Sequence, residues 1–266
     1  MATRGYRLVV LAAQRKGEID PLAACYNISH KCLVPMRGRP LIAHVVQTAA
    51  AYPAVQDVVI SVERDAFDAV LRATASPLRC SAPVRCVAAA GNIADSVLAA
   101  AEGHDGPLII TTADNALLVP TSLDAMVRAL QQHDAAFAMA SKQAVLAAHP
   151  QGQRRFYSFR DGEYSNCNLY GIASPAALKA AEVFRDGGQF AKQAGRIVAA
   201  FGVLNLLLLR LRMVSLSEAA ARISARLGVH LAPVILADGS QAIDVDNERT
   251  YAIVSNLLEK RQNGAS

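Results

Sequence analysis

Three aspartates of this chain are placed to bind a divalent cation. Asp114 ends the apolar run "IITTAD", and Asp244 and Asp246 stand two positions apart in "IDVDNE". Side chains two apart on an extended segment point to the same face, and two carboxylates on one face repel unless a cation or a basic group lies between them. Oxygen ligands of this kind suit Mg²⁺ or Mn²⁺, which need only one or two protein carboxylates when substrate phosphates supply the rest.

Structural roles remain open for the same carboxylates. Asp114 could cap the turn that follows its strand. Asp246 could cap a helix predicted over residues 248–259, where an acidic side chain is favourable. The sequence does not separate these roles from metal binding, and for Asp246 both can hold.

Lys31 follows a long irregular segment. Residues 14–30 contain no apolar run of strand length, which predicts a loop, and long loops inside a compact domain are often functional. Backbone N–H groups in such a loop can bind an anion, to which Lys31 and Arg15 would add positive charge. The segment has neither the spacing of a P-loop nor a G-x-G-x-x-G pattern, so those two nucleotide-binding motifs are excluded.

Composition indicates a folded enzyme-like chain. Of 266 residues, 53% are hydrophobic and 18% are charged, which excludes a disordered or fibrous class. The net charge is +5, but the basic residues are dispersed, so no nucleic-acid partner is expected. The five cysteines form no C-x-x-C pair, and the first apolar run is too short for a signal peptide. These features favour the reducing cytoplasm.

The elements that must position these residues alternate between strand and helix in the first half. Strands are predicted at 6–13, 57–63, 84–89, 107–114 and 135–142, and helices at 41–51, 65–75, 93–103 and 121–132. This order predicts a three-layer α/β/α, Rossmann-like fold with a mostly parallel central sheet. Because ligands bind beyond the carboxyl ends of such strands, loop 14–31, the loop near Gly91 and the residues after Thr112 should share one edge.

The second half is less regular. We expect a hairpin over 155–174 with its turn at Asp161-Gly162, followed by helices at 175–185, 190–213 and 217–227. The last of these carries a capping box formed by Ser215 and Glu218, and it is followed by a strand at 229–236 and the closing helix. No linker interrupts the chain. A single domain over 1–266 is therefore predicted.

The longest apolar stretch, 197–209, would span about 20 Å as a helix, short of the roughly 30 Å core of a bilayer. A buried helix is the preferred interpretation. Contact with a membrane surface through 197–213, where arginines flank the stretch, is the less favoured alternative.

In sequence order, these motifs resemble the MobA-like NTP transferases, nucleotidyltransferases of the GT-A fold. The resemblance rests on "VVLAAQRKG…HKCLVPMRGRPLIAHVV", "AAGNIADSVLAAAE", "IITTAD" and "IDVDNERTY", which together run over nearly the whole chain. It implies a phosphate-binding loop with a catalytic Lys31 and Arg15. The chain departs from the family pattern at Gln14, where glycine is usual, and in the longer loop "EIDPLAACYNIS".

The resemblance also implies a nucleotide-binding half (1–142), an acceptor-binding half (143–266) and roles for other residues. Nucleotide contacts fall on Ala12, Ala13, Gln14, Gly17, Gly91, Asn92 and Ser96. The metal ligands would be Asp114 and Asp246 with Asp244 as a near neighbour. Contacts to the acceptor fall on Asn166 or Asn168, because two registers fit, and on Arg155 and Lys192.

The implied reaction moves an NMP from an NTP to a phosphorylated small-molecule acceptor with release of pyrophosphate. CTP is slightly favoured over UTP or GTP because of the segment at 90–98. A GT-A glycosyltransferase is one alternative, but Asp114-Asn115-Ala116 is not the D-x-D motif that it would need. The other alternative is a nucleotide-binding module without activity, for which Gln14 is the only support. The oligomeric state is not predicted.

Overall fold

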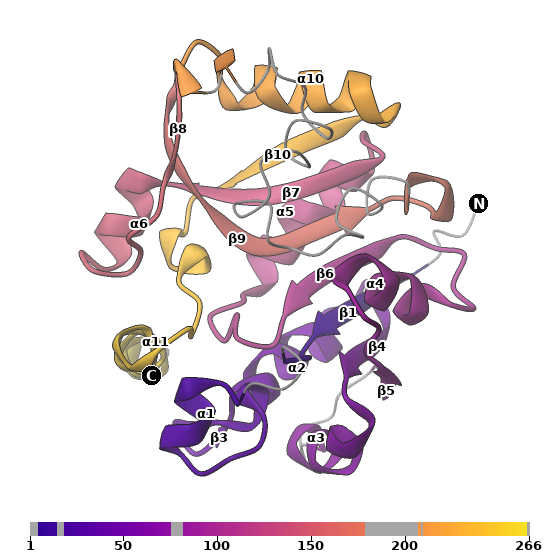
Figure 1. Ribbon diagram of the computed structural model, residues 1–266, viewed down its shortest axis with the longest axis vertical. Coiled ribbons are helices and arrows are strands. Elements are labelled where there is room, and N and C mark those ends of the chain that lie inside the picture. Colours follow the sequence, from indigo (N-terminus) through magenta and orange to yellow (C-terminus); the bar gives the residue numbers. More distant parts are fainter. Residues whose placement is uncertain (1–4, 15–18, 76–81, 179–206, 209, 265–266) are drawn as a thin grey trace.

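The computed structural model describes residues 5–14, 19–75, 82–178, 207–208 and 210–264. An eight-stranded sheet forms the centre, with the strand order β10-β7-β9-β6-β1-β4-β5 and β8 paired to β9 (Figure 1). Its strands are β1 (Tyr6–Leu11), β4 (Val55–Val62), β5 (Val84–Ala88), β6 (Leu108–Thr112), β7 (Ala135–Ser141), β8 (Tyr157–Phe159), β9 (Gly162–Ile172) and β10 (Leu231–Leu236). Strand β9 runs antiparallel to β6, β7 and β8, while the other neighbours are parallel.

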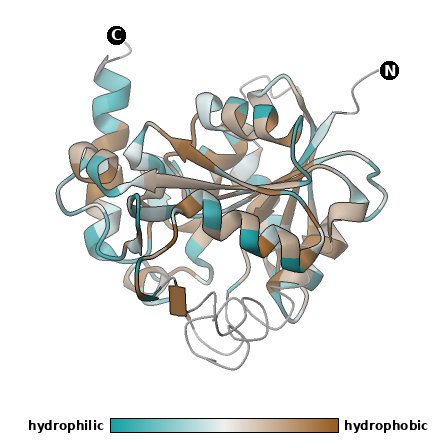
Figure 2. Ribbon diagram, turned by 90° about the horizontal axis from the view of Figure 1, so that it is seen from above, coloured by the Kyte–Doolittle hydropathy of each residue, from teal (hydrophilic) through white to brown (hydrophobic). Residues whose placement is uncertain are grey.

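Helices cover both faces of the sheet (Figure 2). They are α2 (Leu41–Ala51), α3 (Phe67–Thr74), α4 (Ile93–Ala101), α5 (Pro120–Leu130), α6 (Lys142–Ala148), α10 (Leu216–Leu227) and α11 (Glu248–Gly264). Leu8 and Val10 of β1 belong to the large core shared with α2, α5 and α11, whereas Val9 belongs to a smaller core shared with α4. Burial on both faces explains why β1 reads as a continuous apolar run, and the predicted three-layer fold is confirmed.

The direction of strand order reverses at β1. The chain passes from β1 to β4 and β5 on one side, and then returns to β6 on the other side. Connections that leave the carboxyl ends of β1 and β6 therefore diverge, and a crevice forms between them in sheets of this type. The segment with Gln14 and Lys31 leaves β1 at this point, and Asp114 follows β6.

The segment between β1 and α2 is more ordered than predicted. It contains the short helix α1 (Pro21–Cys25), whose first N–H groups are capped by Asp20, and the 3₁₀ helix η1 (Lys31–Leu33). An aspartate followed by proline is a helix-start signal, so the prediction of a featureless loop was wrong. The short strand β2 (Pro35–Met36) follows η1. It pairs with β3 (Arg39–Pro40) across a turn in which Arg37 and Gly38 have positive φ.

The second half follows the prediction in its hairpin β8–β9 and in the capping box of α10, both of which are confirmed. Helix α6 was not predicted. The expected helix 175–185 begins with a 3₁₀ turn, η3 (Pro175–Leu178), and its remainder lies outside the described residues. Most of the expected helix 190–213, with the apolar stretch 197–209, also lies outside them, as do Arg15, Gly17 and Lys192.

Both halves of the predicted domain contribute strands to the one sheet. Within the described ranges, no helix combines the length and the apolar character needed to cross a membrane.

A close backbone contact supports the segment that leads to the acidic motif. The 3₁₀ helix η5 (Gly239–Ala242) lies against α6, so a Cβ atom on Gly239 would sit 2.1 Å from the carbonyl carbon of Ala144. Only glycine allows this approach. Residues 243–246, which follow η5, form no strand.

Candidate active site

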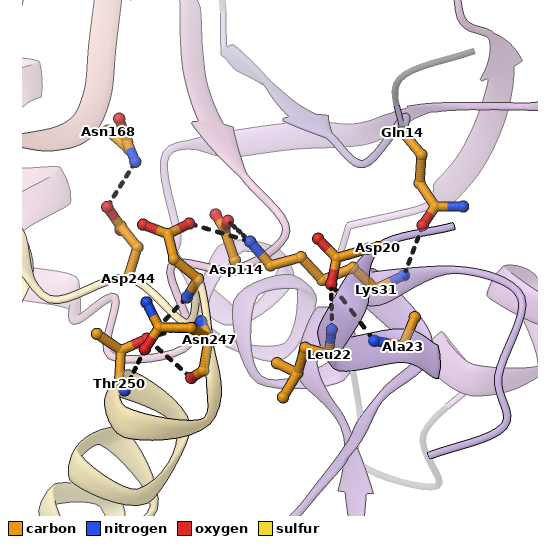
Figure 3. A network of polar contacts seen from close by, with 11 residues as sticks. Gln14, Asp20, Leu22, Ala23, Lys31, Asp114, Asn168, Asp244, Asn247 and Thr250 are labelled. Atoms are coloured by element: carbon orange, nitrogen blue, oxygen red, sulfur yellow. Dashed lines mark hydrogen bonds and ion pairs between the residues drawn. The ribbon is translucent and has the colours of Figure 1, made fainter. Parts of the chain in front are cut away.

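The ammonium group of Lys31 lies between two of the predicted carboxylates. Lys31 Nζ is 2.5 Å from Asp114 Oδ2 and 3.1 Å from Asp246 Oδ1, although these partners are 83 and 215 positions away in the sequence. Figure 3 shows the Lys31 side chain reaching from η1 toward Asp114. Burial by itself would lower the pKa of Lys31, but the two carboxylates outweigh it and the pKa is raised. The lysine is therefore firmly cationic.

Backbone hydrogen bonds bring the two acidic segments together. The N–H of Val245 donates to the C=O of Asp114 at 3.2 Å, which joins the end of β6 to the acidic motif. The N–H of Asp246 donates to the C=O of Asp244 at 3.1 Å, so this segment is a tight turn, and the same-face argument for an extended segment does not apply to it. Asp244 is buried, while the side chain of Asp246 is 63% exposed.

Helix α11 is capped by the residue after Asp246. The Asn247 side chain accepts the N–H of Thr250 at 3.2 Å, and Thr250 Oγ1 accepts the N–H of Asp246 at 2.8 Å. The N–H of Asn247 also donates to Thr250 Oγ1, at 3.1 Å, so Asn247 and Thr250 cap the start of α11 reciprocally (Figure 3). The structural alternative in which Asp246 caps the helix is wrong, and its carboxylate is left for Lys31.

Asp244 is held from the other side by Asn168. Asn168 Nδ2 donates to Asp244 Oδ2 at 2.6 Å, while Asp244 Oδ1 is buried without a hydrogen-bond partner. Burial first, and then the negative charges of Asp114 and Asp246, raise the pKa of Asp244 well above its usual value. A carboxylate in this position has a strong tendency to take up a cation or a proton.

A bulge in β9 aims Asn168 at this site. Phe137 of β7 pairs with Tyr170 and Met139 with Asn166, so extra residues of β9 lie opposite the single residue between them. Asn168 takes a φ of 46° there, a conformation that asparagine tolerates better than most residues. Asn166 Nδ2 donates to Asn168 Oδ1 at 2.8 Å and to the hydroxyl of Tyr170 at 2.6 Å. Of the two asparagines, Asn168 contacts the carboxylate and Asn166 supports it.

Gln14 connects the two ends of the loop that carries Lys31. Its Nε2 donates to the C=O of Ser29 at 2.7 Å, and its Oε1 accepts the N–H of Lys31 at 3.3 Å. Its own N–H donates to Glu63 Oε1 at 2.8 Å, and Glu63 also lies 3.5 Å from the ring of His30. The sequence showed a departure from the family pattern here but not its purpose, because the partners depend on the path of the loop.

The other predicted nucleotide contacts lie at the same edge of the sheet. Ala12 and Ala13 directly follow β1, and Ala13 is exposed. Asn92 caps α4 through the N–H of Asp95, and Ser96 accepts the N–H of Ala90, so both side chains also shape their own loop. A Cβ on Gly91 would meet no atom within 4 Å, which leaves open space above this backbone.

Arg155, a predicted acceptor contact, is exposed on the loop before β8. That loop is joined to α11, because the Arg249 guanidinium donates to the C=O of Gln151. Asn115 is buried, and its amide donates to Thr111 and to the C=O of Cys167. It therefore supports the bulge of β9.

Comparison with known families identifies the domain. The MobA-like NTP transferase domain matches residues 10–198, well over half of the chain. The chain belongs to this family.

Solved structures share the fold of this MobA-like domain. A hypothetical transferase from Thermus thermophilus has a TM-score of 0.75 at 23% identity, over 94% of this chain and 100% of that one. CMP:2-keto-3-deoxy-manno-octonic acid synthetase complexed with CTP has a TM-score of 0.60 at 12% identity, over 97% and 99%. 4-Diphosphocytidyl-2C-methyl-D-erythritol synthase from Anaerococcus prevotii has a TM-score of 0.59 at 8% identity, over 96% of this chain and 99% of that one. Comparison with curated protein sequences gave no significant match.

The chemistry of the acidic residues in this MobA-like site fits a divalent cation. Asp114 Oδ1 and Asp244 Oδ1 are both buried without a partner, and carboxylate oxygens are the ligands that Mg²⁺ prefers. In the part of the chain that the structure describes, no three His, Cys, Asp or Glu side chains form a ready-made metal cluster. Instead, the ammonium of Lys31 lies between two of the carboxylates. Cation binding would require Lys31 to turn away from at least one of them.

The buried thiols near the site are poor nucleophiles. Burial raises the pKa of Cys32, next to Lys31, to about 12, and it also raises the pKa of Cys167, next to Asn168. Because the thiolate is the reactive form, these side chains favour no covalent intermediate in the MobA-like site.

Proposed function

We propose that this protein is a nucleotidyltransferase that moves an NMP from an NTP to a phosphorylated small-molecule acceptor. An oxygen of the acceptor phosphate attacks the α-phosphorus in line, the bond from the α-phosphorus to the bridging oxygen breaks, and pyrophosphate leaves with the electron pair. The observation that carries the proposal is the position of Lys31, a cation held among three aspartates at the carboxyl ends of β1 and β6.

The chain's own residues would act by placement and by charge. Asp114 and Asp246, with Asp244 close by, would hold Mg²⁺ or Mn²⁺, which when bound neutralises phosphate charge. Lys31 would turn from the carboxylates to the triphosphate and stabilise negative charge as the bond to pyrophosphate breaks. Gln14 keeps the backbone of Lys31 in place during this change, and Asn168 keeps Asp244 oriented.

Contacts to the nucleotide and to the acceptor are assigned on geometry and family resemblance. The open space above Gly91, with Asn92 and Ser96 beside it, would take the base and ribose. Arg155 and Lys192 would attract the acceptor phosphate. CTP is proposed first because one structural neighbour is a synthetase complexed with CTP and another is a 4-diphosphocytidyl-2C-methyl-D-erythritol synthase. UTP and GTP remain the next candidates.

A pyrophosphate-release assay tests the proposal. Each of the four NTPs is combined with a panel of sugar and alcohol phosphates, with Mg²⁺, with Mn²⁺ and with EDTA. We expect release with one NTP and acceptor pair, and loss of release in EDTA. Lys31→Ala should lower kcat about 100-fold or more, because one fixed charge on the transition state is removed. Circular dichroism of the variant controls for folding.

Three outcomes would contradict the proposal. Full turnover by Lys31→Ala would remove Lys31 from the catalytic machinery. Absence of pyrophosphate release across the whole panel, together with release of NDP from a sugar nucleotide, would favour a glycosyltransferase. If NTP binds without any turnover of either kind, the protein is a nucleotide-binding module.

A further inference from the structure

Residues 19–37, here called the strap, lie along helix α11 through four contacts. Cys25 Sγ donates to Glu248 Oε1 at 3.3 Å, and the rings of Tyr26 and Tyr251 lie 5.3 Å apart with a 41° tilt. The Tyr251 hydroxyl donates to the C=O of Pro35 at 2.7 Å, and Arg37 lies 3.3 Å from Glu259. In Figure 1 the start of the strap (α1, indigo) and its end near β3 both lie beside α11 (yellow).

These contacts fall on both sides of Lys31 in the sequence. Tyr26 precedes Lys31 and Pro35 follows it, and both contact Tyr251. Tyr251 lies one turn into the helix whose cap, Asn247, directly follows Asp246. The element that carries Lys31 and the element that carries Asp246 are therefore joined through one side chain.

The ion pair between Lys31 and Asp246 is not enough by itself to hold the strap against α11. The Asp246 carboxylate is 63% exposed, and an ion pair with one exposed partner is weakened by water and by salt. The ring contact of Tyr26 with Tyr251 and the hydrogen bond to Pro35 do not depend on charge. They hold the two segments together under conditions in which the ion pair would open.

We propose that Tyr26 and Tyr251 are positioning residues that hold Lys31 and Asp246 at the distance needed for catalysis. This inference rests on the proposed function for its kinetic consequence, but its structural part does not. It also assigns a purpose to the extended loop "EIDPLAACYNIS". The added length forms α1, and α1 presents Tyr26 to α11.

Hydrogen exchange measured by mass spectrometry tests the contact without a substrate. In Tyr26→Ala, amides of both the strap and residues 244–251 should exchange about 3- to 10-fold faster, the range expected when an aromatic pair is lost. Tyr26→Phe keeps the ring and should match the wild type. Tyr157→Ala removes a 61% exposed tyrosine on β8 and serves as the matched control, with no change in either segment.

A second variant tests the same contact between the strap and α11 through a different interaction. Tyr251→Phe keeps the ring pair and removes the hydrogen bond to Pro35, so it should raise exchange in the same two segments by a smaller factor. Faster exchange in the strap alone, with residues 244–251 unchanged in both variants, would overturn the proposal.

Kinetics with the active NTP and acceptor pair give the functional readout. We expect Tyr26→Ala to lower kcat by about the same 3- to 10-fold while KM for the NTP changes less than about twofold, because the loss falls on positioning for the chemical step. Tyr26→Phe should restore kcat. Equal kcat in Tyr26→Ala and the wild type would refute the positioning role and leave the proposed transferase activity intact. A failure to find any substrate pair would refute that activity and leave the exchange result standing.

Discussion

Lys31 balances the charge of the site in the ligand-free protein. Its ammonium faces Asp114 and Asp246, and Asp244 lies close enough for its pKa to respond to all three neighbours. Under the proposed reaction, Lys31 turns to the triphosphate and the carboxylates then require another cation. Binding of nucleotide and binding of a divalent metal should therefore favour one another, because each relieves a charge imbalance that the other would leave.

Gln14 gives the sharpest prediction for a single residue. Gln14→Gly restores the residue usual in the family, but it removes the hydrogen bonds to Ser29 and Lys31 that close the loop. We expect a loss of about 1 kcal/mol in the free energy of unfolding and a lower kcat, since the backbone of Lys31 becomes freer. Urea unfolding and pyrophosphate release measure the two effects.

Gln14→Ala also removes the side-chain amide but does not add the backbone freedom of glycine. It should therefore lower the free energy of unfolding less than Gln14→Gly does. A gain in turnover by Gln14→Gly would mean that the glutamine obstructs the phosphates, which is the opposite of the support described above.

At the level of elements, the acidic turn depends on η5 and α6 behind it. Gly239 touches the backbone of Ala144 and Val145, and the turn with Asp244 begins only a few residues later. Neither partner can rotate away, since the close atoms belong to a helix backbone. The position of Asp244 therefore depends on α6, a helix that makes no contact with substrate in the proposed reaction.

Gly239→Ala should lower the free energy of unfolding by about 3 kcal/mol, because its Cβ would overlap the α6 backbone. Thermal and urea unfolding measure the change. Gly91→Ala is the control for stability, as its Cβ would meet no atom within 4 Å and the free energy of unfolding should not change. Similar losses in the two variants would show that the tight contact at Gly239 is not the cause.

At the level of the whole molecule, the site joins distant parts of the chain. Lys31, Asp114 and Asp246 come from the start, the middle and the end of the described sequence, and one sheet links the elements that carry them. A ligand held by all three should stabilise the fold as one cooperative unit.

Thermal unfolding with each NTP and Mg²⁺ tests this expectation. A ligand present at 100 times its Kd adds about 2.7 kcal/mol to the free energy of unfolding. This should raise Tm by about 5 °C in a single transition. CTP should give the largest increase. A larger shift with another NTP would reject the preference for CTP, and two separate transitions would reject the cooperative unit. Lys31→Ala should reduce the shift.

Sequence patterns predicted the sheet, most helices and the edge at which Lys31 and Asp114 meet, whereas Asp246 was added to the site by the family resemblance. These follow from local periodicity and from the rule that parallel strands present their ligand site at their carboxyl ends. The bulge at Asn168 and the partners of Gln14 could not be predicted in this way. Each depends on contacts between segments far apart in the sequence. Helix α1 is different, because Asp20-Pro21 is a local signal for its start.

The contact between Lys31 and Asp246 has a consequence for folding. The two residues are 215 positions apart, and α11 follows every strand in the chain. Contacts of such long sequence separation form late, because much chain must be ordered before they close. During synthesis every described strand is made before α11, and the loop with Lys31 has to wait for its partner. On refolding, the signal of the assembled sheet should therefore recover before catalytic competence does.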